Sequence, residues 1–308
     1  MDNKANIIFM GTPDFAVPSF VAINEAYGIK AVVTVPDKPK GRGLSLSYSP
    51  IKEKAIELGL PILQPDKLKD GDFIDNLKQY EPDIIVVIAF RILPKEVYSL
   101  AKIASFNIHG SLLPKFRGAA PINHAIINGE TKGGLTSFIL GEKVDTGNIL
   151  LQYECPIDKN MTAGELHDKL MIASANLSLD TISLLISGVY TPIVQDDSLA
   201  SPAPKLFRDN CRIDWNKSQQ EVHNFIRGHS PYPASWTTFE GKQYKIIRTE
   251  LTQQHIDKGT FVIKDNTILV GTSDLALSIL EVQAENKKSM ATKDFLNGWR
   301  GPLKGQFI

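Results

Sequence analysis

The sequence predicts a mainly parallel α/β domain followed by a small β-rich domain. Three observations favour this fold class. Short apolar runs alternate with segments of helical periodicity through the first part of the chain, strand-like runs separated by turn residues fill the last part, and the Pro-, Ser- and Asp-rich stretch TPIVQDDSLASPAPK lies between them. We expect a doubly wound, Rossmann-like domain at residues 1–188, a linker at 189–207 and a small β-barrel domain, OB-like, at 208–308.

Each element of the first domain follows from the residue pattern. The expected strands are continuous runs rich in Val and Ile, as strands covered on both faces should be: NIIFMG, KAVVTVP, DIIVVIAF and IASFNIHG. The expected helices between them are FAVPSFVAINEAYG, SPIKEKAIELG and LPKEVYSLA. A longer helical pattern runs from Thr162 to Gly188, and Thr162 with Glu165 makes a capping box at its start.

The expected C-terminal domain begins with a short helix and continues as strands. The helix is EVHNFIRGHS, and the strands are YKIIRTEL, GTFVIKD, TILVGTS and LALSILEVQAE, with turn residues between them. Formal net charge is zero, but residues 1–204 carry −4 and residues 205–308 carry +4. This asymmetry is either statistical scatter or a C-terminal part that faces a polyanion, and a basic footprint for nucleic acid is usually stronger.

The composition is that of a folded globular protein, and we expect it to be cytoplasmic. Hydrophobic residues make up 43% and charged residues 22% of the 308 residues, close to globular averages. The apolar run near the N-terminus is broken early by Gly11 and Pro13, and no other stretch reaches the ~20 apolar residues of a membrane span. Cys155 and Cys211 lack the spacing of a disulfide framework or zinc site, so we expect no metal. We also expect no membrane association and no obligatory protein partner.

The functional residues should lie where the parallel strands end. In such a sheet, ligands bind beyond the carboxyl ends of the strands, and four segments follow those ends here: 11–13, 37–49, 89–93 and 107–118. The first strand runs into Gly11-Thr12-Pro13-Asp14, which is not G-x-G-x-x-G, and the chain has no phosphate-binding G-x-x-x-x-G-K-[ST] motif. A dinucleotide cofactor is therefore disfavoured.

The stretch FNIHGSLLPKFRGAAPI places Asn107 and His109 at alternate positions, so both project from one face if the strand persists. A neutral amide donor beside a titratable ring suits a carbonyl oxygen that becomes negative in a tetrahedral intermediate, and the ring can also move a proton. Asp145 in GEKVDTGNIL is the best carboxylate to orient His109, because the preceding strand LTSFIL should lie beside it. We expect the three side chains to share one pocket.

Taken singly, these residues have ordinary structural interpretations. An Asn or His at a strand end is most often a turn or capping residue, and Asp-Thr-Gly is a common turn signature. The tripeptide also occurs in aspartic proteases, which need two carboxylates sharing a proton, whereas it occurs once here. Ser111 lies in no G-x-S-x-G elbow, which argues against a serine hydrolase.

These motifs together resemble the folate-dependent formyltransferases. The resemblance rests on the run Asn107 to Ile122, on Asp145-Thr146-Gly147 and on Gly11-Thr12-Pro13, with PDKPKGRG, AFRILP and ENKKSMATKDFLNG elsewhere, so that it covers nearly the whole chain. It implies transfer of the formyl group of 10-formyltetrahydrofolate to the α-amino group of methionine on initiator tRNA. The C-terminal barrel would then help to hold the tRNA.

The resemblance also assigns site residues. Asn107, His109 and Asp145 match the family's catalytic triad, and the residues implied to border the folate are Phe90, Arg91, Ile92, Ser111, Leu112, Leu113 and Pro114. The family commonly has Gly two residues before the catalytic Asp, where this chain has Lys143. Lys143 is then either a solvated loop lysine or an extra charge near the folate.

The loop PDKPKGRGLSLSYS carries Lys38, Lys40 and Arg42, and we expect these cations to contact tRNA. Its two glycines and two prolines predict irregular structure, and the alternative to tRNA binding is a solvated surface loop. Two other functions stay open at this point. An amino-sugar nucleotide could replace tRNA as the acceptor, or the chain could bind tRNA or folate without turnover, which the intact Asn107, His109 and Asp145 argue against.

Overall fold

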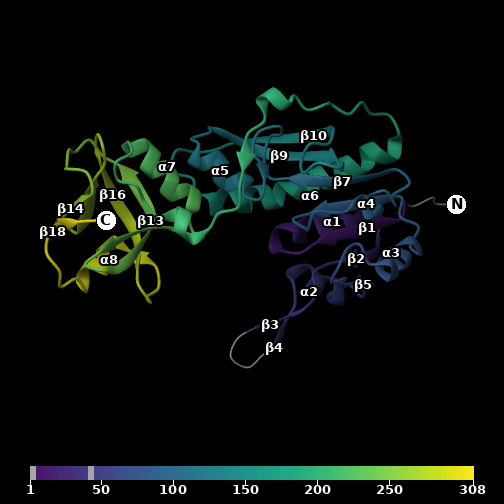
Figure 1. Ribbon diagram of the computed structural model, residues 1–308, viewed down its shortest axis with the longest axis horizontal. Helices are drawn as coiled ribbons and strands as arrows, with labels where there is room; N and C mark the ends of the chain where they lie inside the picture. Colours follow the sequence, from purple (N-terminus) through teal and green to yellow (C-terminus); the bar gives the residue numbers. More distant parts are fainter. Residues whose placement is uncertain (1–4, 41–44) are drawn as a thin grey trace. The chain divides into compact units, whose positions relative to one another are not determined.

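The computed structural model describes residues 5–40 and 45–308. The chain forms two compact units, and each is described by itself (Figure 1). The N-terminal unit comprises Met1–Gly118, Gly134–Cys155 and His167–Pro202, and the C-terminal unit comprises Ala119–Gly133, Pro156–Leu166 and Ala203–Ile308. Two segments from before residue 170 thus belong to the C-terminal unit.

A seven-stranded sheet forms the centre of the N-terminal unit, in the order β10-β9-β7-β6-β1-β2-β5. The parallel strands are β1 (Ile7–Gly11), β2 (Ile29–Val33), β5 (Ile62–Leu63), β6 (Ile84–Ile88) and β7 (Ala104–His109). The sheet is completed by β9 (Lys132–Ile139), antiparallel to β7, and by β10 (Ile149–Pro156). The predicted parallel sheet is confirmed, and so is the placement of LTSFIL beside the strand that ends at His109.

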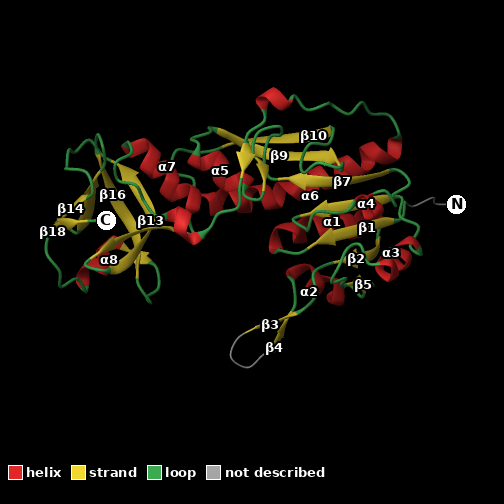
Figure 2. Cartoon of the chain, in the orientation of Figure 1, coloured by secondary structure: helices red, strands yellow, loops and turns green. Residues whose placement is uncertain are grey.

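Helices cover both faces of this sheet, which explains why its strands are apolar throughout (Figure 2). Phe73 and Leu77 of α3 and Val97 of α4 pack in one apolar cluster with β1, β2 and β6. On the other face, Phe20 of α1 contacts Phe9 of β1. The bounds are α1 (Val17–Tyr27), α2 (Pro50–Glu57), α3 (Gly71–Lys78), α4 (Lys95–Tyr98) and α6 (Ala163–Ser187), with short 3-10 turns η1 (Asp14–Ala16) and η2 (Asp197–Leu199).

The long helix α6 begins where the capping box predicts. The Thr162 backbone N–H donates to Glu165, and the Glu165 N–H donates to the Thr162 hydroxyl at 3.2 Å. In the described part of the chain, α6 is the one helix long and apolar enough to cross a membrane, and 39% of its apolar stretch is buried. Its buried Ser174 and Thr181 hydroxyls bond to Ser19 and Ser137, as expected of a helix packed in a core.

The loop after β2 corrects one expectation. Irregular structure was predicted for 36–49, but β3 (Lys38–Lys40) and β4 (Ser45–Ser47) pair as a short antiparallel hairpin. Pro39 lies at an edge position, where a missing backbone N–H is tolerated. The root of the hairpin is held by Asp37, which lies 2.5 Å from Lys52 and accepts a bond from Gln64. These two donors lower the pKa of Asp37, the Lys52 bond contributing most.

The C-terminal unit is built on an antiparallel sheet in the order β12-β13-β16-β15-β14-β18, with β17 beside β16. The strands are β12 (Ser235–Phe239), β13 (Lys242–Leu251), β14 (Thr260–Lys264), β15 (Thr267–Gly271), β16 (Ala276–Ala284), β17 (Met290–Ala291) and β18 (Lys304–Gln306). The sheet curls so far that Ile308, two residues beyond β18, exchanges backbone hydrogen bonds with Thr238 of β12. The predicted small β-domain is confirmed as this half-barrel.

Aromatic side chains fill the inside of the curled sheet. The Phe261 ring lies 4.9 Å from Phe239, 4.8 Å from Phe307 and 6.4 Å from Trp299, measured between ring centroids. Phe239 and Trp299 are 6.1 Å apart. Short elements complete the unit: α5 (Pro121–Ile127), η3 (Arg208–Cys211), α7 (Gln219–His229) and α8 (Thr292–Asn297), while β8 (Arg117–Gly118) and β11 (Pro202–Ala203) lie where the chain passes between units.

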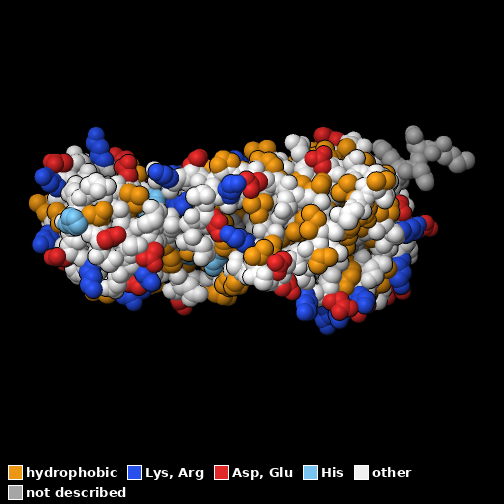
Figure 3. Space-filling view, turned by 90° about the horizontal axis from the view of Figure 1, so that it is seen from above, with side chains coloured by type: hydrophobic (Ala, Val, Ile, Leu, Met, Phe, Trp, Pro, Cys, Tyr) orange, Lys and Arg blue, Asp and Glu red, His pale blue; other side chains and the backbone are white. Residues whose placement is uncertain are grey.

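Lys and Arg side chains are interspersed with Asp and Glu over the face in Figure 3, with no single-sign surface.

Helix α7 buries a row of polar side chains, and residues from before position 170 contact part of this helix. Arg227 donates to the carbonyl oxygen of Met161 at 2.9 Å, and burial lowers the pKa of its guanidinium. Asn123 of α5 donates to the carbonyl oxygen of Gly228 at 2.8 Å. A Cβ at Gly228 would lie 2.4 Å from a side-chain carbon of Ile127, so only glycine lets the two helices approach this closely. The segments 119–133 and 156–166 are therefore packed into the C-terminal unit.

Two buried histidines of α7 should make the C-terminal unit sensitive to acid. Desolvation lowers the pKa of His223 and of His229 below the ordinary value of 6.5, so the folded unit holds both rings neutral. The unfolded chain binds these protons near pH 6.5, and the stability that the neutral rings provide is present above that pH and lost below it. We expect the thermal midpoint to decrease as the pH is lowered from 7.5 to 5.5. His229→Gln should reduce the pH slope of unfolding free energy by up to about 1.4 kcal/mol per pH unit; equal slopes for the two proteins would contradict this.

Candidate active site

Two of the predicted catalytic residues lie at the carboxyl end of β7. Phe106 and Ile108 point into the sheet's apolar packing and are buried, so alternation places Asn107 and His109 together on the other face. The strand register fixes their position along the sheet, since Asn107 lies opposite Val87 of β6 and His109 lies opposite Thr136 of β9. His109 is 6% exposed and Asn107 is half-buried.

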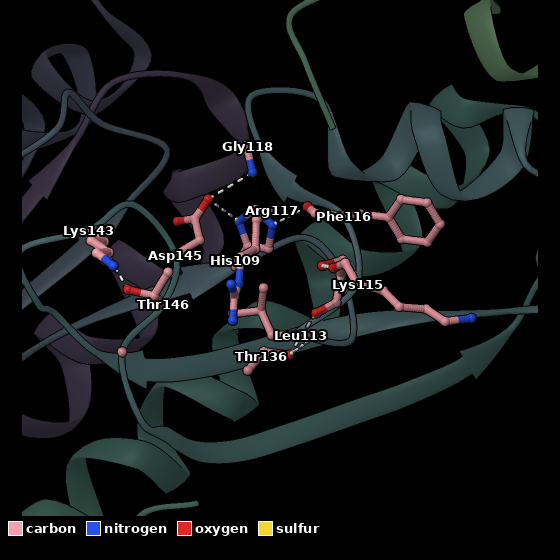
Figure 4. Close-up of polar contacts among 12 residues, drawn as sticks. His109, Leu113, Lys115, Phe116, Arg117, Gly118, Thr136, Lys143, Asp145 and Thr146 are labelled. Carbon is pink, nitrogen blue, oxygen red and sulfur yellow. Dashed lines mark hydrogen bonds and ion pairs between the residues drawn. The ribbon is translucent and has the colours of Figure 1, made fainter. Parts of the chain in front are cut away.

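Asp145 reaches His109 from the loop between β9 and β10. Its Oδ2 lies 3.7 Å from His109 Nδ1 and accepts a hydrogen bond of 2.9 Å from the backbone N–H of Gly118 (Figure 4). The backbone of Asp145 has φ +55°, a left-handed conformation that is uncommon outside glycine. The structure therefore brings Asp145 and His109 together as expected, at a loop position with an unusual backbone.

The orientation of the His109 ring is set from both sides. Its Nε2 donates to the carbonyl oxygen of Phe116 at 2.8 Å, because a carbonyl can only accept, and Nδ1 therefore faces Asp145. Within residues 5–40 and 45–308, the side-chain amide of Asn107 has no hydrogen-bond partner. An unpaired donor next to an oriented imidazole can bind an oxygen that gains negative charge.

The segment Ser111–Pro114 is held tightly against β9 and β10. Thr136 accepts from the Leu113 N–H at 3.0 Å and donates to the Ser111 carbonyl at 2.7 Å, while Gln152 donates to the Leu113 carbonyl. The Ser111 hydroxyl donates to the Lys115 carbonyl at 2.6 Å, and both Ser111 and Leu113 are buried. The position of this segment after β7 is therefore fixed by its own side chains.

The segment Phe90–Ile92 follows β6, the neighbour of β7. Arg91 donates to the carbonyl oxygens of Pro65 and Asp66 and lies 5.2 Å above the Phe90 ring, and burial lowers the pKa of its guanidinium. Its Nε is buried without a hydrogen-bond partner among the described residues. Ile92 is 76% exposed. An exposed apolar side chain beside an unsatisfied donor suits a ligand with both apolar and polar groups.

The predicted tRNA-contacting residues are only partly described. Lys38 is exposed on β3, and the backbone of Lys40 ends that strand. Arg42 lies outside the described residues. Lys143 is exposed on the β9–β10 loop, and its carbonyl oxygen accepts a 3.1 Å bond from the Thr146 hydroxyl. Among residues 5–40 and 45–308, no group of three or more His, Cys, Asp or Glu is placed to hold a metal ion.

Sequence reasoning missed Gln195 and gave Arg117 no role. Gln195, in the segment read as a linker, donates to the carbonyl oxygens of Asp145 and Gly147, and Arg117 donates to Gln195. A signal for Gln195 was lacking, because a lone Gln among Asp, Ser and Pro has no spacing that indicates a function.

Comparisons with known proteins match nearly the whole chain. A family model described as formyl transferase matches residues 5–182, and one described as formyl transferase, C-terminal domain, matches residues 205–300. The methionyl-tRNA formyltransferase of Porphyromonas gingivalis is 45% identical over 310 residues, which cover 96% of each chain.

Two solved structures share the fold. An N-formyltransferase from Helicobacter canadensis, in complex with folinic acid and dTDP-3-aminofucose, superposes with a TM-score of 0.70 at 23% identity over 91% of this chain and all of the other. HypX from Aquifex aeolicus, in complex with tetrahydrofolic acid, gives a TM-score of 0.66 at 16% identity over 96% of this chain and 47% of the HypX chain. At these identities the likeness concerns the fold alone.

Proposed function

The chain belongs to the formyl transferase family and formylates methionyl-tRNA, and from that premise we propose that Asn107, His109 and Asp145 catalyse the transfer. The observation that carries this proposal is the pairing of His109 Nδ1 with Asp145 Oδ2 at 3.7 Å, beside the unpaired amide of Asn107. The three groups lie at the carboxyl edge of the sheet, where open α/β sheets bind their ligands.

The proposed donor is 10-formyltetrahydrofolate. The α-amino nitrogen of the methionyl group attacks the formyl carbon and forms the new C–N bond, and the formyl oxygen becomes negative in the tetrahedral intermediate. Asn107 donates a hydrogen bond to this oxygen. The bond between the formyl carbon and N10 of the folate then breaks, the carbonyl re-forms, and N10 receives the proton that the amine has lost.

His109 is the group we propose to carry that proton. The incoming substrate replaces the Phe116 carbonyl at Nε2, and the neutral ring then carries its single proton on Nδ1, directed at Asp145. The free lone pair of Nε2 takes the proton from the amine nitrogen and delivers it to N10. The Asp145 carboxylate beside Nδ1 orients the ring and stabilises it while it holds the extra proton. The Gly118 N–H keeps the carboxylate in that direction.

The folate would lie between the two segments that follow β6 and β7. Phe90, Arg91 and Ile92 offer an apolar surface and a buried unsatisfied N–H, and the second wall is the segment Ser111–Leu112–Leu113–Pro114. The folates bound to HypX and to the Helicobacter enzyme support a folate co-substrate. The reaction would take place in the cytoplasm, where charged tRNA is used, and the C-terminal unit would help to hold the tRNA.

One assay tests the acceptor. The purified protein is incubated with 10-formyltetrahydrofolate and either methionyl-tRNA or dTDP-3-aminofucose, the sugar bound by the Helicobacter enzyme. We expect formylmethionyl-tRNA and no formylated sugar. Turnover of the sugar alone would move the chain to the sugar N-formyltransferases, and turnover of neither acceptor would support a binding protein.

The loop that carries Lys38, Lys40 and Arg42 gives a further prediction. We propose that it clamps the phosphates of the acceptor end, with Arg42 making a bidentate contact. Arg42→Ala should raise KM for methionyl-tRNA and flatten the log–log salt dependence by up to about one unit, with folate binding unchanged. Lys78→Ala, an exposed cation on α3, is the matched control. Equal salt slopes for Arg42→Ala and wild type would make the loop a solvated surface feature.

A further inference from the structure

The segment between α6 and the C-terminal unit places one buried amide beside the candidate active site. Gln195 is 8% exposed, and its Nε2 donates to the carbonyl oxygens of Asp145 at 2.9 Å and of Gly147 at 2.7 Å. Both N–H groups of the amide therefore hold the backbone of the loop that carries Asp145.

The oxygen of the same amide is held by Arg117. Gln195 Oε1 accepts from Arg117 Nε at 3.1 Å and from Nη2 at 2.8 Å, and Nη2 also pairs with Asp197 Oδ1 at 2.7 Å. The next residue, Gly118, donates its N–H to the Asp145 carboxylate. Gln195 thus links two segments that hold Asp145. One is the backbone of residues 145–147, and the other is the segment Arg117–Gly118, whose Gly118 N–H binds the Asp145 side chain.

Neighbouring residues anchor this segment at both ends. Ile193 exchanges two backbone hydrogen bonds with Ile149 at the start of β10, at 2.8 and 2.9 Å. Ser201 accepts the Phe116 N–H on its hydroxyl at 2.9 Å, and the Arg117 N–H donates to the Ser201 carbonyl. Because Phe116 carries the carbonyl that receives His109 Nε2, the segment 193–201 contacts the supports of both His109 and Asp145.

The loop around Asp145 needs such support. Asp145 has φ +55°, which costs a non-glycine residue free energy, and a Cβ at Gly147 would lie 1.7 Å from the Ile139 carbonyl oxygen. Two of the loop's carbonyl oxygens are satisfied by the Gln195 amide. Without that amide, the loop would lose the two hydrogen bonds that stabilise this backbone conformation.

We propose that Gln195 is a positioning residue for formyl transfer, which keeps the Asp145 carboxylate against His109 by holding the backbone of residues 145–147 to Arg117. The inference rests on the function proposed above. A glutamine is needed because glutamate would place an oxygen against two carbonyl oxygens, and methionine has the same length without a donor. Gln195 touches neither substrate in this proposal.

The test compares Gln195→Met with a matched variant, Gln219→Met. Gln219 in α7 is 7% exposed, and its Nε2 also donates to two backbone carbonyl oxygens, those of Thr252 and Ala276. Both variants lose the two bonds that the amide N–H groups donate, and Gln195→Met also loses the two that Oε1 accepts from Arg117, so both should lower the thermal midpoint. We expect kcat to fall about 10- to 100-fold in Gln195→Met, with KM for both substrates within about threefold, and to be unchanged in Gln219→Met.

Hydrogen–deuterium exchange gives a readout that does not need turnover. Peptides that cover residues 140–149 should exchange faster in Gln195→Met than in wild type, and at the wild-type rate in Gln219→Met. The kcat of the double variant Gln195→Met/Asp145→Asn should be only slightly lower than that of Asp145→Asn alone, because both changes remove the same carboxylate contact.

The outcomes separate this inference from the function on which it rests. A wild-type protein without formyl transfer would defeat the proposed function, whatever Gln195 does. An active wild type together with an unchanged kcat in Gln195→Met, or a fully multiplicative loss in the double variant, would overturn the positioning role alone. An equal fall of kcat in Gln195→Met and Gln219→Met would also overturn it, because general destabilisation would then explain both.

Discussion

Asn107→Ala is expected to lower kcat for formyl transfer by about a hundredfold or more, while KM for both substrates changes by no more than about threefold. The amide is half-buried on β7 and is unpaired within the described residues, so it is available to an oxygen that becomes negative only after attack. Loss of such a donor destabilises the transition state and leaves the ground state almost unchanged, which is why the effect should appear in kcat.

Two measurements secure this result. Asn76→Ala, an exposed amide on α3, should leave kcat at the wild-type value. The thermal midpoint of Asn107→Ala should stay close to wild type, since its side chain has no hydrogen-bond partner to lose among residues 5–40 and 45–308. If instead KM rises strongly with kcat unchanged, Asn107 binds substrate and does not stabilise the intermediate.

His109→Ala and Asp145→Asn should each lower kcat by about 10²- to 10⁴-fold, because both act on the proton transfer between the amine and N10. Asp145→Asn keeps the shape of the side chain and can still accept from the Gly118 N–H, so its effect isolates the missing charge beside His109 Nδ1. His109→Ala removes the ring altogether and should be the more damaging change.

The double variant measures whether the two residues act as one unit. Once the ring is absent, the carboxylate has nothing to orient. The kcat of His109→Ala/Asp145→Asn should therefore be at most about threefold lower than that of His109→Ala alone. Steady-state and single-turnover rates at saturating methionyl-tRNA provide the comparison. Losses that multiply would mean that Asp145 acts elsewhere than through His109.

Local sequence patterns predicted the parts of the fold that depend on local physics. The apolar runs ending at Gly11, Ile88 and His109 form strands because continuous Val and Ile side chains suit a sheet covered on both faces. Thr162 and Glu165 mark the start of α6 because their side chains satisfy N–H groups that no helical bond can reach. The candidate catalytic residues were found by alternation along one strand and by the likeness of that stretch to a known family.

Features that depend on distant residues could not be predicted in this way. Gln195 holds a loop fifty residues earlier in the chain, and hydrogen bonds between such positions leave no spacing in the sequence. The β3–β4 hairpin forms although Pro39 and the nearby glycines argued for irregular structure, because an edge strand tolerates a missing donor. The membership of residues 119–133 and 156–166 in the C-terminal unit depends on contacts with α7, whose buried polar side chains resemble a surface pattern.

This membership has a consequence for the order in which the protein is made. Synthesis proceeds from the N-terminus at about 5–20 residues per second, so α5 leaves the ribosome several seconds before α7. Until then Asn123 and Ile127 lack the Gly228 backbone against which they pack, and the Met161 carbonyl lacks the Arg227 guanidinium. A nascent chain halted before residue 205 would therefore leave the packing surface of α5 and the Met161 carbonyl exposed until the rest of the C-terminal unit is made.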